Sequence, residues 1–479
     1  MPQHVPPTLT AAPNPLPAAP PAPPPIGTPA PAATPGGVPD RAATRSGRSS
    51  RGGGAVGAPR RIVFLSRRDL GNPAAGGSEL LVDRLAEGLT ELGHEVTLLC
   101  GGPAVYRDYR VVSAGGDLGH FLRAPAAFTR QVGACDLLVE VCNGLPYLAP
   151  LWHRGPTLCL VNHVHTELWG MRYPRPAAGI GRRLERWALS GAQRGNLLVA
   201  VSESTASALG ALGVDPDRIR IVHNGVEEPG PRTPRSPEPL FLAVGRLVEY
   251  KRIDLLLRLW ERVRPVTGGT LVIVGDGPEA RRLEALAGPG VVFAGRVSEE
   301  EKHRLLCASW LLLHPSAVEG WGLVVTEAAG RGTPSIGFDV PGLRDSVEDG
   351  VTGALVRGES AFAAAWCALA LDHDRREAMG RAAALRAGRY RWATTVRRFR
   401  DVAAEAAARH GAPAPGDATG RDGAALPAGA PARTPAAATA RTPTAPAAPA
   451  TARTPTAPAE PTPARTPTAP AEPTAPRRG

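Results

Sequence analysis

Short apolar runs alternate with helix-like segments through the middle of the chain, and this alternation constrains the fold more than any other feature of the sequence. The runs at 61–65, 136–141, 157–162 and 196–202 are nearly continuous in apolar residues. Strands of this kind occur in parallel sheets that helices cover on both faces. The first of them opens a strand, glycine loop, helix and strand, which is a βαβ unit. We therefore predict a parallel α/β sheet.

A proline-rich segment at 227–239 divides this alternation into two. It holds five prolines and almost no apolar residues, as expected of a linker between domains. The alternation restarts at Leu240, with glycines at the strand ends, which predicts a doubly wound nucleotide-binding fold. The predicted organisation is a Rossmann-like domain at 59–226, the linker at 227–239, a second Rossmann-like domain at 240–391 and a helix at 392–410 that crosses back to the first domain.

Both ends of the chain have a different composition from the middle. Residues 1–58 and 411–479 are rich in proline and alanine, and the second segment repeats ARTP units whose arginines are at 433, 441, 453 and 465. Such segments carry too few large apolar groups to offset the entropy of ordering the chain. We predict disordered or extended tails.

Charge and cysteine usage narrow the classes of function. The formal net charge is +11, but the arginines are dispersed and no zinc-finger or RNA-recognition signature is present, so no nucleic-acid partner is predicted. The six cysteines form no CxxC pair, which predicts free thiols in a reducing compartment. No signal-peptide pattern and no long apolar stretch is found, and we predict a cytoplasmic protein.

One basic segment raises the question of membrane contact. In AGIGRRLERWALSGAQ, residues 178–193, three arginines, Arg182, Arg183 and Arg186, stand close to Trp187. The segment could rest peripherally on the inner face of the plasma membrane. It could equally be a helix with a solvated arginine face. The sequence leaves both interpretations open.

Two carboxylates bracket a glycine-containing loop in HPSAVEGWGLVVTE, residues 314–327. Gly320 and Gly322 prevent a continuous helix, so we expect Glu319 in a turn and Glu327 in the second turn of the next helix. Free backbone N–H groups and the positive end of a helix dipole then lie between the two acids. Phosphate suits the amides and sugar hydroxyls suit the carboxylates, which predicts a nucleotide-sugar site. The alternative is a solvated loop residue and an ordinary helix charge.

Further candidates follow predicted strands. Arg246 and Lys251 come after the first strand of the second domain, where two cations would balance a diphosphate. Gly77 precedes the first helix of the first domain, and His165 follows the strand at 157–162. Open α/β sheets bind ligands at these carboxyl ends. No metal is predicted, because His163 and His165 have no third ligand at a recognisable spacing.

The motifs as an ordered set resemble the retaining glycosyltransferases of family 4, which have the GT-B architecture. The resemblance covers roughly residues 61–400. It rests on GGSE (76–79), HT (165–166), VSES (201–204), HNGV (223–226), VGRLVEYK (244–251), IVGDGP (273–278), FAGRV (293–297), HPSAVEGWGLVVTEAAGRGTP (314–334) and GLRDSVEDGVTG (342–353).

The resemblance implies two Rossmann-like domains facing each other across a cleft, with the acceptor on the first and a nucleotide-diphosphate-sugar donor on the second. It implies that Arg246 and Lys251 neutralise the diphosphate and that Glu327 accepts from the ribose hydroxyls. The remaining implied contacts are Glu319 with the transferred sugar, amides of Gly322 and Leu323 with phosphate or sugar, Gly77 and Gly320 near the donor, and His165 lining the sugar pocket.

The predicted activity is metal-independent, retaining transfer of a hexose-type sugar to a glycan, lipid-linked or small-molecule acceptor, with no cofactor beyond the donor. Asp345 and Trp321 depart from the family pattern, which more often has Glu and Phe there, and they loosen any inference about the donor. The alternatives are a nucleotide-sugar epimerase or a phosphorolytic enzyme on the same fold, or a non-catalytic sugar-nucleotide-binding scaffold that acts through its tails.

Overall fold

The computed structural model describes residues 59–102, 105–116, 119–228 and 233–411. The predicted tails at 1–58 and from 412 onward, with their ARTP units, lie outside the described residues, and so does part of the predicted linker.

The first domain is built on a parallel sheet, as predicted. Its strands in the described residues run in the spatial order β3-β2-β1-β4-β5-β6-β7. Neighbouring strands pair in parallel throughout. The strands are β1 (Arg61–Arg68), β2 (Glu95–Gly101), β3 (Arg110–Ser113), β4 (Leu137–Asn143), β5 (Thr157–His163), β6 (Leu197–Ala200) and β7 (Ile219–Ile221).

Helices cover both faces of this sheet, which explains why its strands are apolar without alternation. In β1, Ile62 and Phe64 pack in one cluster with the apolar side of the first helix, whereas Val63 and Leu65 pack in another. The helical segments of the domain are α1 (Gly77–Glu91), α2 (His120–Ala127), η1 (Phe128–Val132), η2 (Ala149–Leu151), α3 (Thr166–Arg172), α4 (Arg175–Arg186), η3 (Trp187–Ala192), α5 (Glu203–Ala211) and η4 (Pro216–Arg218).

The second domain repeats this plan with a smaller parallel sheet. The order of its described strands is β10-β9-β8-β11-β12-β13. Every neighbouring pair is parallel. The strands are β8 (Leu240–Val244), β9 (Thr270–Val274), β10 (Val291–Gly295), β11 (Leu311–His314), β12 (Ser335–Phe338) and β13 (Gly353–Val356).

Aromatic side chains fill one face of the second sheet. Phe241 packs edge-on against Trp260 and Trp366, and the two indoles stack 5.5 Å apart. The helical segments of this half are η5 (Glu249–Lys251), α6 (Ile253–Thr267), α7 (Ala280–Glu284), α8 (Glu299–Ala308), α9 (Leu323–Gly330), α10 (Leu343–Ser346), α11 (Glu359–Leu371), α12 (His373–Ala387) and α13 (Trp392–Gly411).

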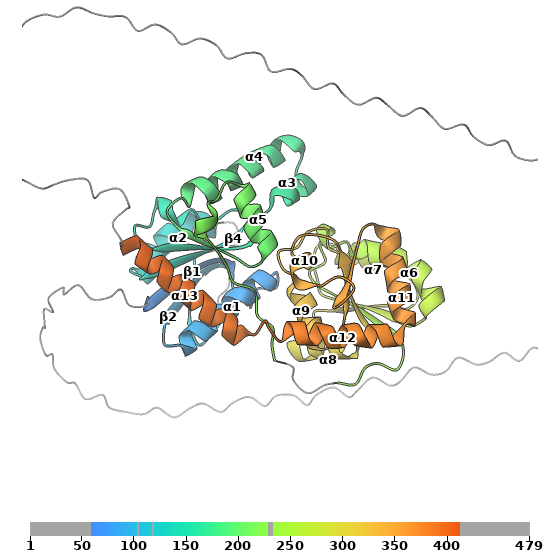
Figure 1. Ribbon diagram of the computed structural model, residues 1–479. Coiled ribbons are helices and arrows are strands. Elements are labelled where there is room, and N and C mark those ends of the chain that lie inside the picture. The colour runs from blue at the N-terminus through green and yellow to red at the C-terminus, as the bar shows by residue number, and fades with distance from the viewer. Residues whose placement is uncertain (1–58, 103–104, 117–118, 229–232, 412–479) are drawn as a thin grey trace, which may run out of the picture. The chain divides into compact units, whose positions relative to one another are not determined.

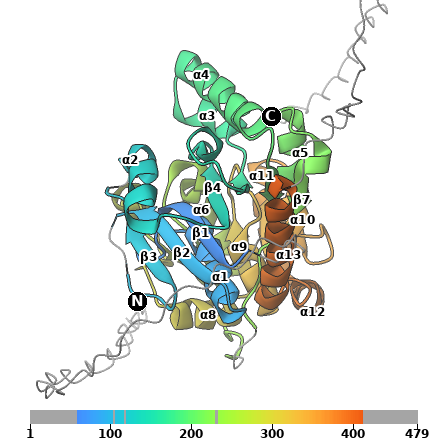
Figure 2. The same cartoon turned by 90° about the vertical axis from the view of Figure 1, so that its left-hand side faces the viewer.

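The final helix packs on the first domain although it follows the second in sequence. Figures 1 and 2 show α13 beside α1. Phe399 of α13 is fully buried in the core of the first sheet and stacks on Phe64 at 5.8 Å between ring centroids. The chain enters this helix next to the point where it leaves the first domain, because the backbone N–H of Val226 donates to the carbonyl of Tyr390 at 2.7 Å.

One predicted helix begins later than expected. The stretch EYKRIDLLLRLWERV, residues 249–263, predicts one continuous helix, but α6 begins at Ile253. Arg252 has a left-handed backbone, with φ at +52°, which a continuing helix does not permit. Residues 249–251 therefore form the separate turn η5.

Candidate active site

The order of the second sheet brings two loops together. The strand order reverses between β8 and β11, so the connections that leave these neighbouring strands diverge to opposite faces. Doubly wound sheets bind ligands outside the carboxyl ends of the strands at such a point. The loop after β8 carries Arg246 and Lys251, and the loop after β11 carries Glu319, as the sequence predicted.

Glu319 lies in that loop as a buried carboxylate with two partners. One oxygen accepts from the Lys251 ammonium and also lies 2.6 Å from Nε2 of His314. Burial alone would raise the pKa of Glu319, but the charges and hydrogen bonds of Lys251 and His314 outweigh it and hold the pKa well below its usual range. Glu319 is therefore ionised at neutral pH.

Lys251 reaches this carboxylate because of the break at Arg252. The left-handed residue separates η5 from α6 and ends the turn directly after Lys251. Arg252 itself is held away from the site, since its guanidinium donates to Glu359 at 2.7 Å and lies 5.0 Å from the ring centre of Phe338. The lysine ammonium has three donors, so it can contact Glu319 and a second anionic group together.

The helix after the loop begins as predicted. Gly322 precedes α9 with φ at +83°, a conformation that only glycine adopts without strain, and Leu323 is the first helical residue. The first N–H groups of a helix have no partner within it. Glu327 occupies the second turn of α9 and is 8% exposed.

Glu327 has a cationic partner on another helix. Nζ of Lys302 in α8 lies 3.1 Å from one oxygen of Glu327 and 2.7 Å from Glu299. Burial raises the pKa of Glu327 above its usual value, and Lys302 opposes that rise without cancelling it. The two bracketing acids thus differ electrostatically, because the pKa of Glu319 falls while that of Glu327 rises.

Two glycines allow the first domain to approach this loop. A Cβ on Gly320 would collide with the backbone carbonyl of Asn162, at the end of β5. A Cβ on Gly77, the first residue of α1, would lie 3.0 Å from Cδ1 of Leu323. Both predicted glycines therefore lie where the domains contact each other, beside Glu319 and the start of α9.

Arg246 lies at the edge of the site formed by Lys251, Glu319 and the start of α9. Its side chain is exposed and donates to the hydroxyl of Tyr250 at 3.1 Å. It also borders the first domain, because a Cβ on Gly76 would lie 3.5 Å from Nε of Arg246. It has no ion pair with Glu319 or Glu327 among the described residues, so its charge is directed to the solvent side of the site.

His165 lies beside the group formed by Lys251 and Glu319 and is not part of it. Its backbone N–H donates to Glu185 at 2.6 Å and its ring lies 5.3 Å from that of His163. Burial, followed by the charges of His163 and Arg172, lowers the pKa of His165 to about 3. A neutral imidazole that can donate and accept hydrogen bonds remains.

Three residues in or beside the site were not assigned by sequence reasoning. His314 closes β11, and its position at a strand's carboxyl end was the signal that could have identified it. His163 is electrostatically coupled to Glu319 and Lys251, whereas His165 is not. Lys302 left no such signal, because α8 reads in sequence as an ordinary charged helix.

The two departures from the family pattern lie between the domains. Trp321, 2% exposed, stacks on His223 at 4.9 Å and meets Tyr390 edge-on at 5.0 Å. Asp345 accepts a hydrogen bond of 3.0 Å from the backbone N–H of Ser204. Neither side chain joins the Lys251–Glu319 pair, and both make contacts between the domains.

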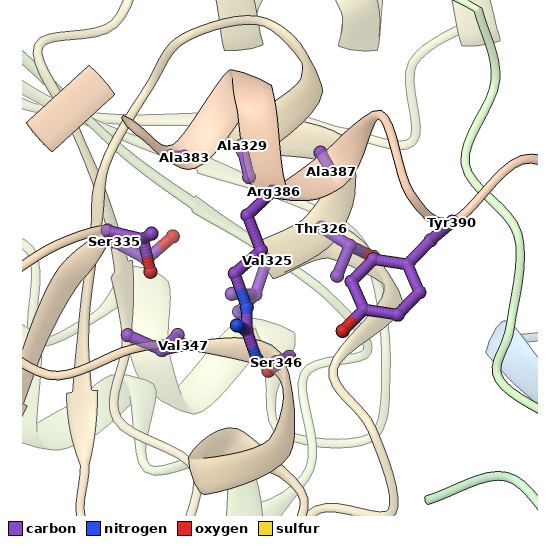
Figure 3. A pocket seen from close by; sticks show the side chains of 11 residues that line it. Val325, Thr326, Ala329, Ser335, Ser346, Val347, Ala383, Arg386, Ala387 and Tyr390 are labelled. Carbon is purple, nitrogen blue, oxygen red and sulfur yellow. The ribbon is translucent and has the colours of Figure 1, made fainter. Parts of the chain in front are cut away.

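A small cavity lies on the other side of α9. Val325, Thr326 and Ala329 line it together with residues of α12, and Figure 3 shows Arg386 and Tyr390 among the lining side chains. None of the predicted site residues borders it. We therefore place the candidate site at Lys251, Glu319 and the start of α9.

Two searches of the described residues bear on partners. No group of three or more His, Cys, Asp or Glu side chains in that part of the chain could hold a metal ion. Within the same residues, none of the helices has the length and apolar character needed to cross a bilayer.

Comparisons with known proteins point to one family. Residues 75–228 match the family described as Glycosyltransferase Family 4, and residues 238–372 match Glycosyl transferases group 1. A curated relative, D-inositol 3-phosphate glycosyltransferase of Nocardia farcinica, is 32% identical over 274 residues, which are 52% of this chain and 59% of that protein. The chain thus matches about three fifths of the length of this relative.

Solved structures agree on the fold. Sucrose-phosphate synthase from Thermosynechococcus elongatus superposes with a TM-score of 0.61 at 22% identity, over 71% of this chain and 97% of that one. Anabaena Alr3699/HepE, solved in complex with UDP and glucose, gives 0.58 at 19% identity, over 71% and 98%. With its two doubly wound domains and its two family matches, the chain belongs to the group 1, family 4 glycosyltransferases and has the GT-B fold.

Proposed function

We propose that this protein is a retaining glycosyltransferase that moves a hexose-type sugar from a nucleotide-diphosphate-sugar to an acceptor hydroxyl. The observation that carries the proposal is the ionised, buried Glu319, held by Lys251 and His314 immediately before the start of α9. A carboxylate accepts from sugar hydroxyls, and a lysine beside free helix amides attracts phosphate. The two requirements of a nucleotide-sugar are met where the loops after β8 and β11 come together.

The donor is proposed to bind across the loops after β8 and β11. Its diphosphate contacts Lys251 and Arg246 and the amides of Gly322 and Leu323, where the helix dipole favours negative charge. Glu327 accepts from the ribose hydroxyls, with Lys302 keeping the carboxylate oriented. Glu319 faces the transferred sugar. Gly320 and Gly77 leave room for the backbone on either side, and neutral His165 lines the sugar pocket.

We propose that the transfer retains the anomeric configuration of the sugar. The bond between the anomeric carbon and the diphosphate breaks while the acceptor hydroxyl attacks from the same face. A phosphate oxygen of the leaving group takes the hydroxyl proton. The protein stabilises the charge that develops on the phosphates through Lys251, Arg246 and the start of α9, and one such contact is worth a few kcal/mol, about 3. We propose that this stabilisation needs no metal and no further cofactor.

The acceptor is proposed to bind on the first domain. Glycans, lipid-linked sugars and small molecules remain candidates. D-inositol 3-phosphate is the first compound to test, because the Nocardia relative carries that name. Its phosphate would suit a protein with a net charge of +11.

A panel of nucleotide-sugars tests the donor site directly. A donor present at 100 times its dissociation constant should raise the free energy of unfolding of the full chain by about 2.7 kcal/mol, measured as a thermal shift. Incubation of the stabilising donor with an acceptor, followed by NMR of the product, should show an unchanged anomeric configuration. A donor that is altered without any acceptor would indicate an epimerase, and no shift with any member of the panel would refute the assignment.

A further inference from the structure

The helix pair α3–α4 presents an apolar stripe to solvent. Ile180, Leu184 and Trp187 are 68%, 41% and 47% exposed. Their spacing of four and then three residues places them along one side of the helix. The opposite side of α4 faces the domain, where Ala178, Gly181 and Glu185 are buried. Both views in Figures 1 and 2 show α3 and α4 projecting from the first sheet.

Arginines of α4 border this stripe, and no acid of α4 is exposed beside it. Arg183 and Arg186 are exposed on α4, and Arg175 is exposed at its start. The single carboxylate of α4, Glu185, points inward, where it accepts from the backbone of His165 and from the indole of Trp169. The carboxylate of α4 is thus used inside the domain, and the exposed acid of the helix pair is Glu167, in the first turn of α3.

Neighbouring residues add further exposed apolar side chains to this surface. Met171 at the end of α3 is 51% exposed, and Tyr173, which joins the two helices, is 45% exposed. Trp169 packs against the backbone of Gly181, where a Cβ would collide with the indole, so α3 is fixed against α4. The exposed apolar residues are therefore held on a rigid support.

We propose that the stripe of Ile180, Leu184 and Trp187 with its bordering arginines docks the protein on an anionic phospholipid bilayer. A helix with Ile, Leu and Trp on one side and arginines beside them lies in the interfacial plane of a membrane. Trp and Tyr prefer the headgroup level, and arginines there gain from anionic lipid. The stripe lies on a projecting helix and not in a groove, which suits a bilayer better than an apolar peptide. The proposal is independent of the transfer chemistry.

Co-sedimentation of the full chain with vesicles tests the charge component. Wild-type protein should bind vesicles of equal parts phosphatidylglycerol and phosphatidylcholine and should bind pure phosphatidylcholine weakly. Arg183→Glu/Arg186→Glu should weaken binding to the anionic vesicles by at least about 25-fold, because each basic residue at such a surface contributes about fivefold. Arg381→Glu/Arg397→Glu changes the net charge equally at exposed positions of α12 and α13 and should cost less than about threefold.

The apolar component needs its own pair of variants. Ile180→Ser/Trp187→Ser should weaken binding to the same vesicles by about tenfold or more. Leu122→Ser/Leu385→Ser removes two side chains that are 88% and 79% exposed elsewhere and should leave it unchanged. Thermal unfolding of each variant establishes that it is folded. Failure of wild type to bind vesicles, or equal losses in test and control variants, would overturn the proposal.

Discussion

At the scale of single residues, the site depends on how a buried carboxylate remains charged. Glu319 lies between an ammonium and an imidazole, and these two groups overcome the cost of removing the carboxylate from water. Removing one partner of a buried pair leaves an uncompensated charge. Lys251 therefore has two tasks in the proposed mechanism, since it keeps Glu319 ionised and meets the diphosphate.

Substitution of Lys251 should impair transfer without preventing the protein from folding. Lys251→Ala is expected to lower kcat/KM for transfer by about 10²- to 10³-fold, because a charge contact made in the transition state is lost. The chain should still unfold cooperatively, which a urea titration would show. Arg258→Ala removes an exposed arginine paired with Asp254 and should change neither property. Near-wild-type transfer by Lys251→Ala and by Glu327→Ala would contradict the site.

The neutral state of His165 predicts a pH dependence of stability. Its pKa is lowered from about 6.5 to about 3, so the unfolded chain binds a proton that the folded chain does not bind over that range. The contribution of neutral His165 to the free energy of unfolding is fully present above pH 6.5 and is lost as the pH falls towards 3. The loss between pH 7 and pH 5 is about 2 kcal/mol. His165→Asn should remove this share of the pH slope in urea titrations.

The positions of residues relative to strands and helices could be predicted from sequence where the strand pattern was informative. Glu319, Gly322 and Lys251 could be placed because each stands just beyond a strand or at a helix start. Lys302 could not, because its contact with Glu327 depends on the packing of α8 against α9, and the spacing of the two residues in sequence carries no trace of it.

At the scale of elements, α9 depends on the glycine before it. Gly322 has φ at +83°, and a Cβ there would lie 2.9 Å from Leu343. Gly322→Ala should lower the free energy of unfolding by about 1–2 kcal/mol and should also weaken donor binding, because the first amides of α9 shift.

A matched glycine makes the Gly322→Ala prediction specific. Gly288 has no positive φ, and a Cβ there meets no atom within 4 Å. Gly288→Ala should leave both the unfolding free energy and the donor thermal shift unchanged. If the two variants behaved alike, the backbone at Gly322 would have no special role.

Element prediction failed where local patterns are short or interrupted. β3 has four residues at the edge of its sheet and offers too little periodicity to predict. The helix expected from Glu249 is interrupted by a left-handed arginine, which no propensity scale anticipates. The long buried strands and α9 were predicted correctly, because burial on both faces and glycine punctuation are properties of the sequence itself.

At the scale of the whole molecule, α13 belongs structurally to the first domain. Phe399, a residue of this helix, is fully buried and stacks on Phe64 of β1. Phe399→Ala should lower the free energy of unfolding by about 3–5 kcal/mol, because it leaves a cavity in the first core. Hydrogen exchange should accelerate in α1 and not in α11, which packs on the second core. Faster exchange in α11 alone would contradict this.

The return of α13 also fixes the order in which the protein can be completed on the ribosome. The first core includes Val396, Phe399 and Ala403, which are synthesised only after the entire second domain. Domains that are contiguous in sequence fold from the N-terminus as they emerge. Here the first domain emerges first but cannot complete its core until α13 has been synthesised. Its α1 and β1 therefore stay partly uncovered until the second domain has been made.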